Sequence, residues 1–265
     1  MMTAIAALCL PADTQAQSIR AADIISAEVI PGWRSEDGTH MAALHLRLAD
    51  GWKTYWRAPG ELGIPPRFEW NGSQNISAVR LLWPRPVVFD QLGANSIGYV
   101  GELILPMEFT LRDAGAPARL ATQVELGVCE TICVPVSLDV SAELAPSASA
   151  PDPAITAALA DRPQPAGSAG LRQVTCTVEM IPQGIRLTAR MEMPPLSDRE
   201  FAVFELSDKS AWISDTATER EGGLLTARAD IIPGGDAPFA LERSDLRITI
   251  LGEDSAVEMR GCPSG

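Results

Sequence analysis

Alternation of apolar and polar residues runs through most of this chain, and it restricts the fold more than any other feature. Over residues 41–48, Leu44, Leu46 and Leu48 fall on one face and His45 falls on the other, which is the period of a half-buried strand. We therefore expect His45 to face solvent. Four further strand candidates are separated by turn signals. They are residues 76–82, 103–111, 118–126 and 134–140. This spacing is typical of a β-sandwich.

The composition changes after the last of these strands, where Pro, Ala and Ser dominate. Such a stretch is typical of a linker, and it contains one short helix candidate at residues 154–160. Strand patterns then return at residues 171–180, 184–193, 201–206, 224–231 and 246–251. The sequence therefore predicts an all-β chain of two β-sandwich domains, residues 17–145 and 171–265, joined by a Pro/Ala/Ser-rich linker at residues 146–170.

The N-terminus has features of a secretory signal. An apolar run over residues 1–10 is followed by Thr14 and Ala16, small residues at the positions that signal peptidase recognises. We expect residues 1–16 to be a signal peptide, whose removal takes Cys9 with it. No Lys or Arg precedes the apolar run, so an ordinary N-terminal tail is the alternative. No later stretch reaches the roughly 18 apolar residues of a membrane span, so we do not expect the mature protein to be membrane-spanning.

Charge and histidine content argue against several functions. The net charge is −13 and no basic cluster occurs, which argues against nucleic acid or an anionic membrane surface as a partner. Only two histidines occur, His40 and His45. This argues against a histidine-rich metal site and against a Cys-His-Asn hydrolase site near Cys129. We expect no cofactor and no metal ion.

The cysteines suggest two bonds with different roles. After the loss of Cys9, four cysteines remain, and they allow three pairings. Pairing Cys129 with Cys133 and Cys176 with Cys262 keeps each pair in its own half. Closing the long loop stabilises a fold by roughly 4–5 kcal/mol in the loop-entropy model, whereas a four-residue spacing contributes little. The short pair therefore favours redox exchange, and the alternatives are a turn staple or two buried, inert thiols.

Exchange requires one cysteine that a partner can reach and a second that resolves the mixed disulfide. Glu130 disfavours a thiolate at this pair, and no Lys, Arg or His lies between Gln123 and Leu144. A thiol that is not strongly acidified suits an electron donor better than a strong oxidant. Asp90 and Glu130 are candidate proton acceptors, although isolated loop carboxylates are usually solvated.

Three ordered motifs carry a family resemblance. They are residues 51–60 (GWKTYWRAPG), Trp83-Pro84 followed by residues 98–106 (GYVGELILP), and residues 127–135 (GVCETICVP). Over residues 20–145 the chain resembles the N-terminal periplasmic domain of the thiol:disulfide interchange protein DsbD, and more closely its relatives in the ScsB group. The resemblance implies an immunoglobulin-like domain located in the periplasm.

The resemblance also implies a function. Cys129 and Cys133 would accept electrons from a membrane-embedded thiol reductase of the DsbD or CcdA type and pass them to periplasmic thioredoxin-like proteins. In the family pattern the second cysteine meets the partners, which favours Cys133. The final acceptor could be a disulfide, a sulfenic acid or a cytochrome c maturation factor. The family's membrane and thioredoxin-like domains are not found here, so we expect a separate membrane protein to supply electrons and residues 171–265 to serve docking or spacing.

In DsbD a cap loop shields the sulfurs, and by order along the chain the matching stretch is residues 89–95, before the strand that holds Tyr99. Asp90, Gln91 and Leu92 form the middle of this stretch. Leu92 stands where the family has an aromatic cap residue. Because of this departure, the tightness of the shielding does not follow from the resemblance.

Two other functions fit the same residues. A secreted, non-catalytic binding module would use both disulfides as structural bonds. A copper-handling protein would bind Cu(I) through the short cysteine pair and a nearby methionine such as Met107. Trp52, Tyr55 and Trp56 are candidates for a recognition surface, but packing within the sheets is the favoured role for the tryptophans.

Overall fold

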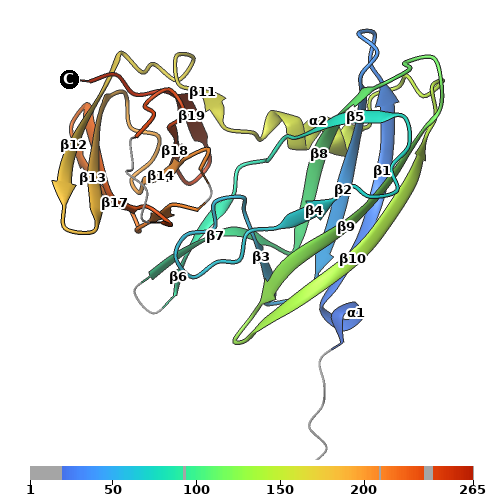
Figure 1. The fold of residues 1–265 in the computed structure, drawn as a ribbon, viewed down its shortest axis with the longest axis horizontal. Coiled ribbons are helices and arrows are strands. Elements are labelled where there is room, and N and C mark those ends of the chain that lie inside the picture. The colour runs from blue at the N-terminus through green and yellow to red at the C-terminus, as the bar shows by residue number, and fades with distance from the viewer. Residues whose placement is uncertain (1–19, 92–93, 209, 236–240, 265) are drawn as a thin grey trace, which may run out of the picture.

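The computed structural model describes residues 20–91, 94–208, 210–235 and 241–264. The predicted signal peptide, Cys9 and Leu92 lie outside the described residues. Nearly all regular structure in the described part is antiparallel β-sheet, and the sheets form two sandwiches that follow one another along the chain (Figure 1). The prediction of an all-β, immunoglobulin-like fold is therefore confirmed.

Residues 25–144 form two facing sheets. The first has the order β1-β2-β8-β5, with β1 (Ile25–Arg34), β2 (His40–Leu48), β8 (Glu102–Leu111) and β5 (Ile76–Leu81). The second has the order β10-β9-β3-β7-β6, with β10 (Cys133–Leu144), β9 (Ala118–Cys129), β3 (Lys53–Tyr55), β7 (Ala94–Val100) and β6 (Val87–Gln91), and β4 (Arg67–Glu69) pairs with β9. A one-turn helix, α1 (Ala21–Ile24), precedes β1.

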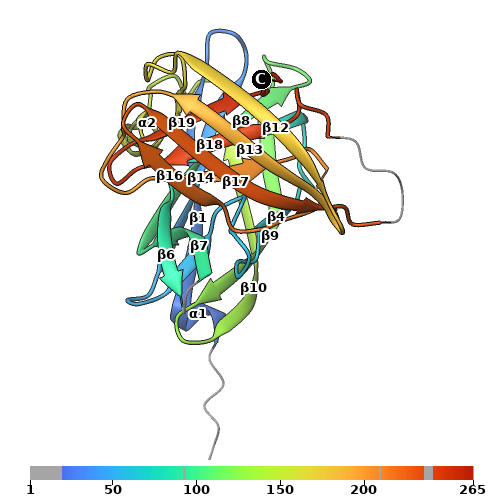
Figure 2. The same cartoon turned by 90° about the vertical axis from the view of Figure 1, so that its left-hand side faces the viewer.

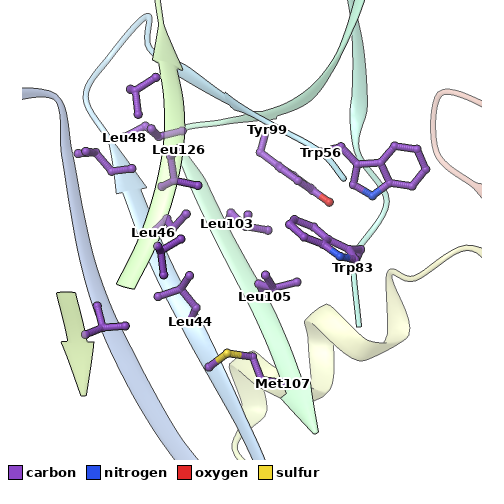
Figure 3. Close-up of a cluster of buried hydrophobic side chains, with 14 of the residues drawn as sticks. Leu44, Leu46, Leu48, Trp56, Trp83, Tyr99, Leu103, Leu105, Met107 and Leu126 are labelled. Atoms are coloured by element: carbon purple, nitrogen blue, oxygen red, sulfur yellow. The ribbon is translucent and has the colours of Figure 1, made fainter. Parts of the chain in front are cut away.

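The core of this first half lies between the two sheets and follows from the alternation. Leu44 and Leu46 of β2 stand opposite Leu105 and Leu103 of β8, and all four side chains are buried (Figure 3). Burying one such side chain contributes roughly 1.5–3 kcal/mol. A row of them across two strands therefore fixes which face of the sheet turns inward.

The prediction that His45 faces solvent is wrong. His45 does point to the outer face of its sheet, but only 6% of it is exposed. Its imidazole lies between two carboxylates from the flanking strands, with Nδ1 3.1 Å from Glu28 and Nε2 2.5 Å from Glu102. The alternation therefore identified the face correctly, but longer side chains of neighbouring strands cover the ring.

Residues 164–260 form the second sandwich. One sheet has the order β11-β19-β18-β14, with β11 (Gln164–Pro165), β19 (Ala256–Arg260), β18 (Arg247–Leu251) and β14 (Phe201–Glu205). The other has the order β12-β13-β17-β15, with β12 (Gln173–Ile181), β13 (Gly184–Glu192), β17 (Leu224–Ile232) and β15 (Trp212–Ile213), and β16 (Ala217–Glu221) pairs with β17. Strands β12, β13 and β17 lie side by side across the face seen in Figure 2.

The segment predicted to be a linker is folded against its neighbours. Asp152 caps α2 (Pro153–Ala160) by accepting hydrogen bonds from the N–H groups of Ala154 and Ile155, a typical N-cap. Ile155 is fully buried against the outer face of the first sheet, in a cluster with Met41, Ala43 and Leu82. After the helix, β11 pairs in parallel with β19. The segment is therefore a packed connection and not a free coil.

Candidate functional site

The Cys129–Cys133 pair closes a long, regular hairpin. Strands β9 and β10 pair without a register shift from Leu144 opposite Ala118 to Cys133 opposite Cys129. The N–H of Glu130 donates to the carbonyl of Ile132 at 3.0 Å and closes the turn. Because the two cysteines face each other at the hairpin end, their Cα atoms are 4.1 Å apart and the sulfurs form a disulfide.

The two cysteines of this bond differ in their exposure to solvent. Cys129 is only 1% exposed, whereas Cys133 is an exposed residue. The turn residues that join them are also exposed, including Ile132 at 55%. A partner that approaches from solvent therefore meets Cys133 before the buried Cys129.

Tyr55 contacts both sulfurs. Its hydroxyl lies 3.1 Å from Sγ of Cys129 and 3.6 Å from Sγ of Cys133, and the residue is 1% exposed. Strand β3 lies beside β9 with Lys53 opposite Cys129, so Tyr55, two residues further on, shares the face of the disulfide. Burial raises the pKa of the Tyr55 hydroxyl, so it stays protonated at neutral pH and can donate to sulfur.

Lys53 is on the strand next to Cys129, but its ammonium extends toward β6. It is 7% exposed and stands opposite Cys129 in the ladder. Its Nζ lies 4.8 Å from the centroid of the Phe89 ring on β6, and burial lowers the pKa of the ammonium. Lys53 is far from Cys129 in the sequence, and only the pairing of β3 with β9 places it opposite this cysteine.

A loop after β3 covers the tyrosine and the neighbouring part of β9. A Cβ at Gly63 would lie 2.9 Å from Cδ1 of Tyr55, and a Cβ at Gly127 would lie 2.9 Å from Cβ of Ile64. A side chain at Gly63 would collide with Tyr55, and a side chain at Gly127 would collide with Ile64. The loop around Gly63 and Ile64 is therefore packed tightly against the face that carries the disulfide.

The predicted cap stretch forms the edge hairpin of β6 and β7. Asp90 pairs with Asn95 and Gln91 pairs with Ala94. The structure places Tyr99 away from the sulfurs, in the core, where its ring stacks on Trp83 with centroids 6.4 Å apart (Figure 3). Its hydroxyl donates to the carbonyl of Pro84 at 2.8 Å, and burial raises its pKa well above the usual value.

The other predicted site residues are distributed as follows. Glu130 is exposed in the turn and lies beside Gly51, where a Cβ would come within 3.0 Å of its Oε1. Trp52 and Trp56 are both buried, which confirms the packing interpretation for the tryptophans. Met107 is buried in β8, in the sheet that faces the cysteine-bearing sheet, so the structure does not assemble the copper ligand set.

The second cysteine pair is a different kind of bond. Cys176 and Cys262 form a disulfide with Cα atoms 5.7 Å apart, and they are 0% and 2% exposed. Within the described residues, no group of three or more His, Cys, Asp or Glu is suited to hold a metal ion. No helix in the same part of the chain is long and apolar enough to cross a bilayer.

An immunoglobulin-like sandwich with a partly accessible hairpin disulfide is the class of domain that the fold and the site define. The sequence model of the family described as thiol:disulfide interchange protein DsbD, N-terminal, matches residues 22–144. The resemblance predicted from the three motifs is therefore confirmed. This segment therefore resembles a DsbD-type thiol:disulfide interchange domain, and it contains the Cys129–Cys133 disulfide.

Among solved structures, the N-terminal periplasmic domain of ScsB from Proteus mirabilis is similar over both halves. It is 22% identical, the match covers 91% of this chain and 92% of that chain, and the TM-score is 0.65. The C-terminal domain of the AgI/II polypeptide BspA from Streptococcus agalactiae is 10% identical over 89% of this chain and 93% of that one, with a TM-score of 0.15. No curated protein sequence matches the chain.

Proposed function

We propose that this protein is a periplasmic thiol:disulfide oxidoreductase that relays electrons through Cys129 and Cys133. Its electron donor is a membrane-embedded thiol reductase of the DsbD or CcdA type, and its acceptors are periplasmic thioredoxin-like proteins. Residues 17–145 form the redox domain in this proposal and residues 171–265 form a second domain. The observation that carries the proposal is an exposed Cys133 bonded to a buried Cys129, with the Tyr55 hydroxyl beside both sulfurs.

The reducing half-reaction begins with the disulfide seen in the structure. A thiolate of the donor attacks Sγ of Cys133, the bond to Cys129 breaks, and Cys129 leaves as a thiolate. The second thiolate of the donor then attacks the donor sulfur that is bonded to Cys133. This forms a disulfide within the donor and releases Cys133 as a thiolate. Two electrons have entered the protein, the donor has become a disulfide, and the two cysteine thiolates are free to take up protons from solvent.

The oxidising half-reaction reverses these roles. Cys133 as a thiolate attacks a disulfide sulfur of the acceptor and releases the acceptor's other sulfur as a thiolate. Cys129 then attacks Sγ of Cys133, which restores the internal disulfide and releases the acceptor's second thiolate. The acceptor leaves as a dithiol after protonation, so two electrons and two protons balance the cycle.

One group on β3 favours the thiolate of Cys129 in both steps. The protonated hydroxyl of Tyr55 is within hydrogen-bond distance of this sulfur, and a hydrogen bond to the charged form of a group favours that form. Because exchange is faster when the leaving sulfur is a stabilised thiolate, the Tyr55 hydroxyl assists the departure of Cys129.

Exposed apolar side chains near Cys133 supply a surface for the partners. Ile132 is 55% exposed, Val100 is 54% exposed and Ile64 is 44% exposed. In the sheet, Lys53 pairs with Val100 on one side and with Cys129 on the other. Ile64 lies over Gly127 of β9. Apolar residues around an accessible sulfur can be covered by a partner while the mixed disulfide exists.

The test is the reduction potential of the Cys129–Cys133 bond in the full chain, measured by equilibration with glutathione and dithiothreitol buffers and thiol trapping for mass spectrometry. A value in the range of roughly −180 to −270 mV, which exchange catalysts occupy, supports the relay. The buried Cys176–Cys262 bond is the internal control and should stay oxidised. A value below about −300 mV for Cys129–Cys133 contradicts the relay and indicates a structural bond in a binding module.

A further inference from the structure

The second half of the molecule binds the segment that directly follows β3, the strand that carries Tyr55. Arg57 follows two residues after Tyr55 and reaches across to the second sandwich. Its guanidinium donates to both carboxylate oxygens of Glu205 on β14, at 2.9 Å each, and to Glu258 on β19 at 2.6 Å. The same guanidinium lies 4.2 Å from the centroid of the Trp56 ring. The side chain of Arg57 therefore connects the end of β3 to two strands of the second half.

This contact is buried and its charges are balanced. The side chain of Arg57 is 17% exposed and that of Glu205 is 5% exposed. Arg247 adds a second cation, 3.7 Å from Glu205 and 3.7 Å from Glu258. Removing one partner from a buried, paired cluster leaves an uncompensated charge and is strongly destabilising. The cluster therefore holds the position of β3 against the second half firmly.

A second contact fixes the loop that covers Tyr55. The N–H of Asp215 donates to the carboxylate of Glu61 at 3.1 Å. The Asp215 carboxylate accepts hydrogen bonds from the backbone N–H and the side-chain amide of Asn95, at 2.9 and 3.3 Å. Asp215 thus joins the loop after β3 to the start of β7, and these two segments also touch directly, because a Cβ at Gly60 would lie 2.6 Å from the Asn95 carbonyl oxygen.

These two contacts lie on the two sides of Tyr55. Arg57 anchors the chain that leaves the tyrosine, and Asp215 anchors the loop whose Gly63 packs against the tyrosine ring. Apolar residues join the same junction, because Val203, Leu251 and Ala256 of the second half belong to the core cluster of the first. The ring position, and with it the position of the hydroxyl, therefore depends on the second half.

We propose that the second half is a clamp that positions the Tyr55 hydroxyl on the sulfurs, with Arg57 and Glu61 as the positioning residues that bind it. This inference rests on the proposed exchange function and assigns a role to a half that has no reactive group of its own in that function. A hydrogen bond weakens steeply when its distance and angle change. A small displacement of β3 or of the covering loop therefore removes the hydroxyl from Cys129 and slows its departure as a thiolate.

The experiment compares exchange rates of the full chain with dithiothreitol as the reductant, followed by trapping of free thiols. Tyr55→Phe defines the loss of the hydroxyl, which we expect to slow exchange by about tenfold. Glu61→Ala, which removes the carboxylate that accepts from the N–H of Asp215, and Arg57→Gln should slow exchange to a similar extent. Glu61→Gln keeps an oxygen that can accept from this N–H and should restore most of the rate. Asp230→Asn, which weakens the Arg186–Asp230 ion pair elsewhere in the second half, is the matched control and should exchange at the wild-type rate.

A double variant separates positioning from a general loss of stability. If Glu61 acts through the tyrosine, Glu61→Ala should slow exchange no further in the Tyr55→Phe background, because effects of coupled residues are not additive. Additive slowing, or unchanged exchange in the folded Glu61→Ala variant, overturns the clamp. Because Arg57→Gln can fail to fold, the decision rests on Glu61→Ala, whose folding is checked by thermal unfolding. Wild-type protein that does not exchange at all contradicts the proposed function itself, so the two failures are distinguishable.

Discussion

The two disulfides of this protein occupy opposite kinds of environment. Cys129 and Cys133 are 4 residues apart at the end of a hairpin, and Cys133 is exposed. Cys176 and Cys262 are 86 residues apart and both are buried. The carbonyl of Cys176 also accepts a hydrogen bond from Arg243 at 2.9 Å. A bond that spans little chain and meets solvent is suited to exchange, whereas a bond that spans most of its half and is buried is suited to stability.

The first prediction concerns the exposed bond and has the largest expected effect. Cys133→Ser removes the only sulfur of the short pair that belongs to an exposed residue. We expect exchange with glutathione to fall to the level of a protein without the pair, while the free energy of unfolding changes little, since a four-residue loop contributes little. Thiol trapping with mass spectrometry measures the first quantity and urea unfolding the second. Exchange that persists in this variant would show that Cys129 is reached directly.

The second prediction concerns the buried bond. Replacing both Cys176 and Cys262 by Ala should lower the free energy of unfolding by about 4 kcal/mol, because the bond closes a long loop. Exchange at Cys133 should continue under conditions in which the variant is folded. Urea unfolding and thiol trapping are again the measurements. Unchanged stability would contradict the structural role of the bond.

The third prediction compares the halves through their histidines, because His40 and His45 both lie in the first half and the second half contains none. Burial lowers the pKa of His40, and the neighbouring Arg34 lowers it further. The unfolded chain therefore binds a proton more readily than the folded chain. The contribution of neutral His40 is present above the unfolded pKa of about 6.5 and is lost as the pH falls below it.

His40→Gln should therefore flatten the fall in stability between pH 7.5 and pH 5.5, which urea unfolding at several pH values measures. The wild-type protein should lose stability over this interval more steeply than the variant. If both proteins show the same pH dependence, other groups in the first half control the acid response.

The fourth prediction has the smallest effect. Glu130 is an exposed carboxylate in the turn between the redox cysteines, and removing its charge favours a thiolate nearby. Glu130→Gln should raise the rate of alkylation of Cys133 in the reduced protein by about twofold, because exposed charges are screened by solvent and salt. Glu143→Gln, at the far end of β10, is the matched control. A rate that falls in Glu130→Gln would contradict the electrostatic argument.

The sequence allowed the long strands and both cysteine pairs to be predicted, because these depend on local alternation and on cysteine spacing. It did not reveal β1, whose pattern breaks at a bulge. The register shifts between Ile30 and Trp33, and Gly32 has a φ of 62°, with the carbonyl of Met41 so close that a Cβ would meet it at 2.0 Å. Strand β3 was missed because it is only three residues long.

The partners of the sulfurs could not be predicted for a different reason. Tyr55 lies 74 residues before Cys129 in the sequence and reaches it only through the pairing of β3 with β9. Single-sequence patterns identify faces of strands but not which strands become neighbours. The role of Tyr55 therefore became visible only when the sheet order was known.

The packed connection between the halves has a consequence for encounters with other proteins. A flexible chain of its length would let the halves reorient over roughly 25–30 Å, and a partner would meet them in many arrangements. Here Ile155 packs α2 against the first sheet, and Arg85 donates its backbone N–H to the carbonyl of Asp161 and its guanidinium to the carboxylate of Asp161. In the function proposed above, a reductase at the membrane and an acceptor in solution would therefore meet the same preformed surface, and neither would have to order a loose chain before electrons move.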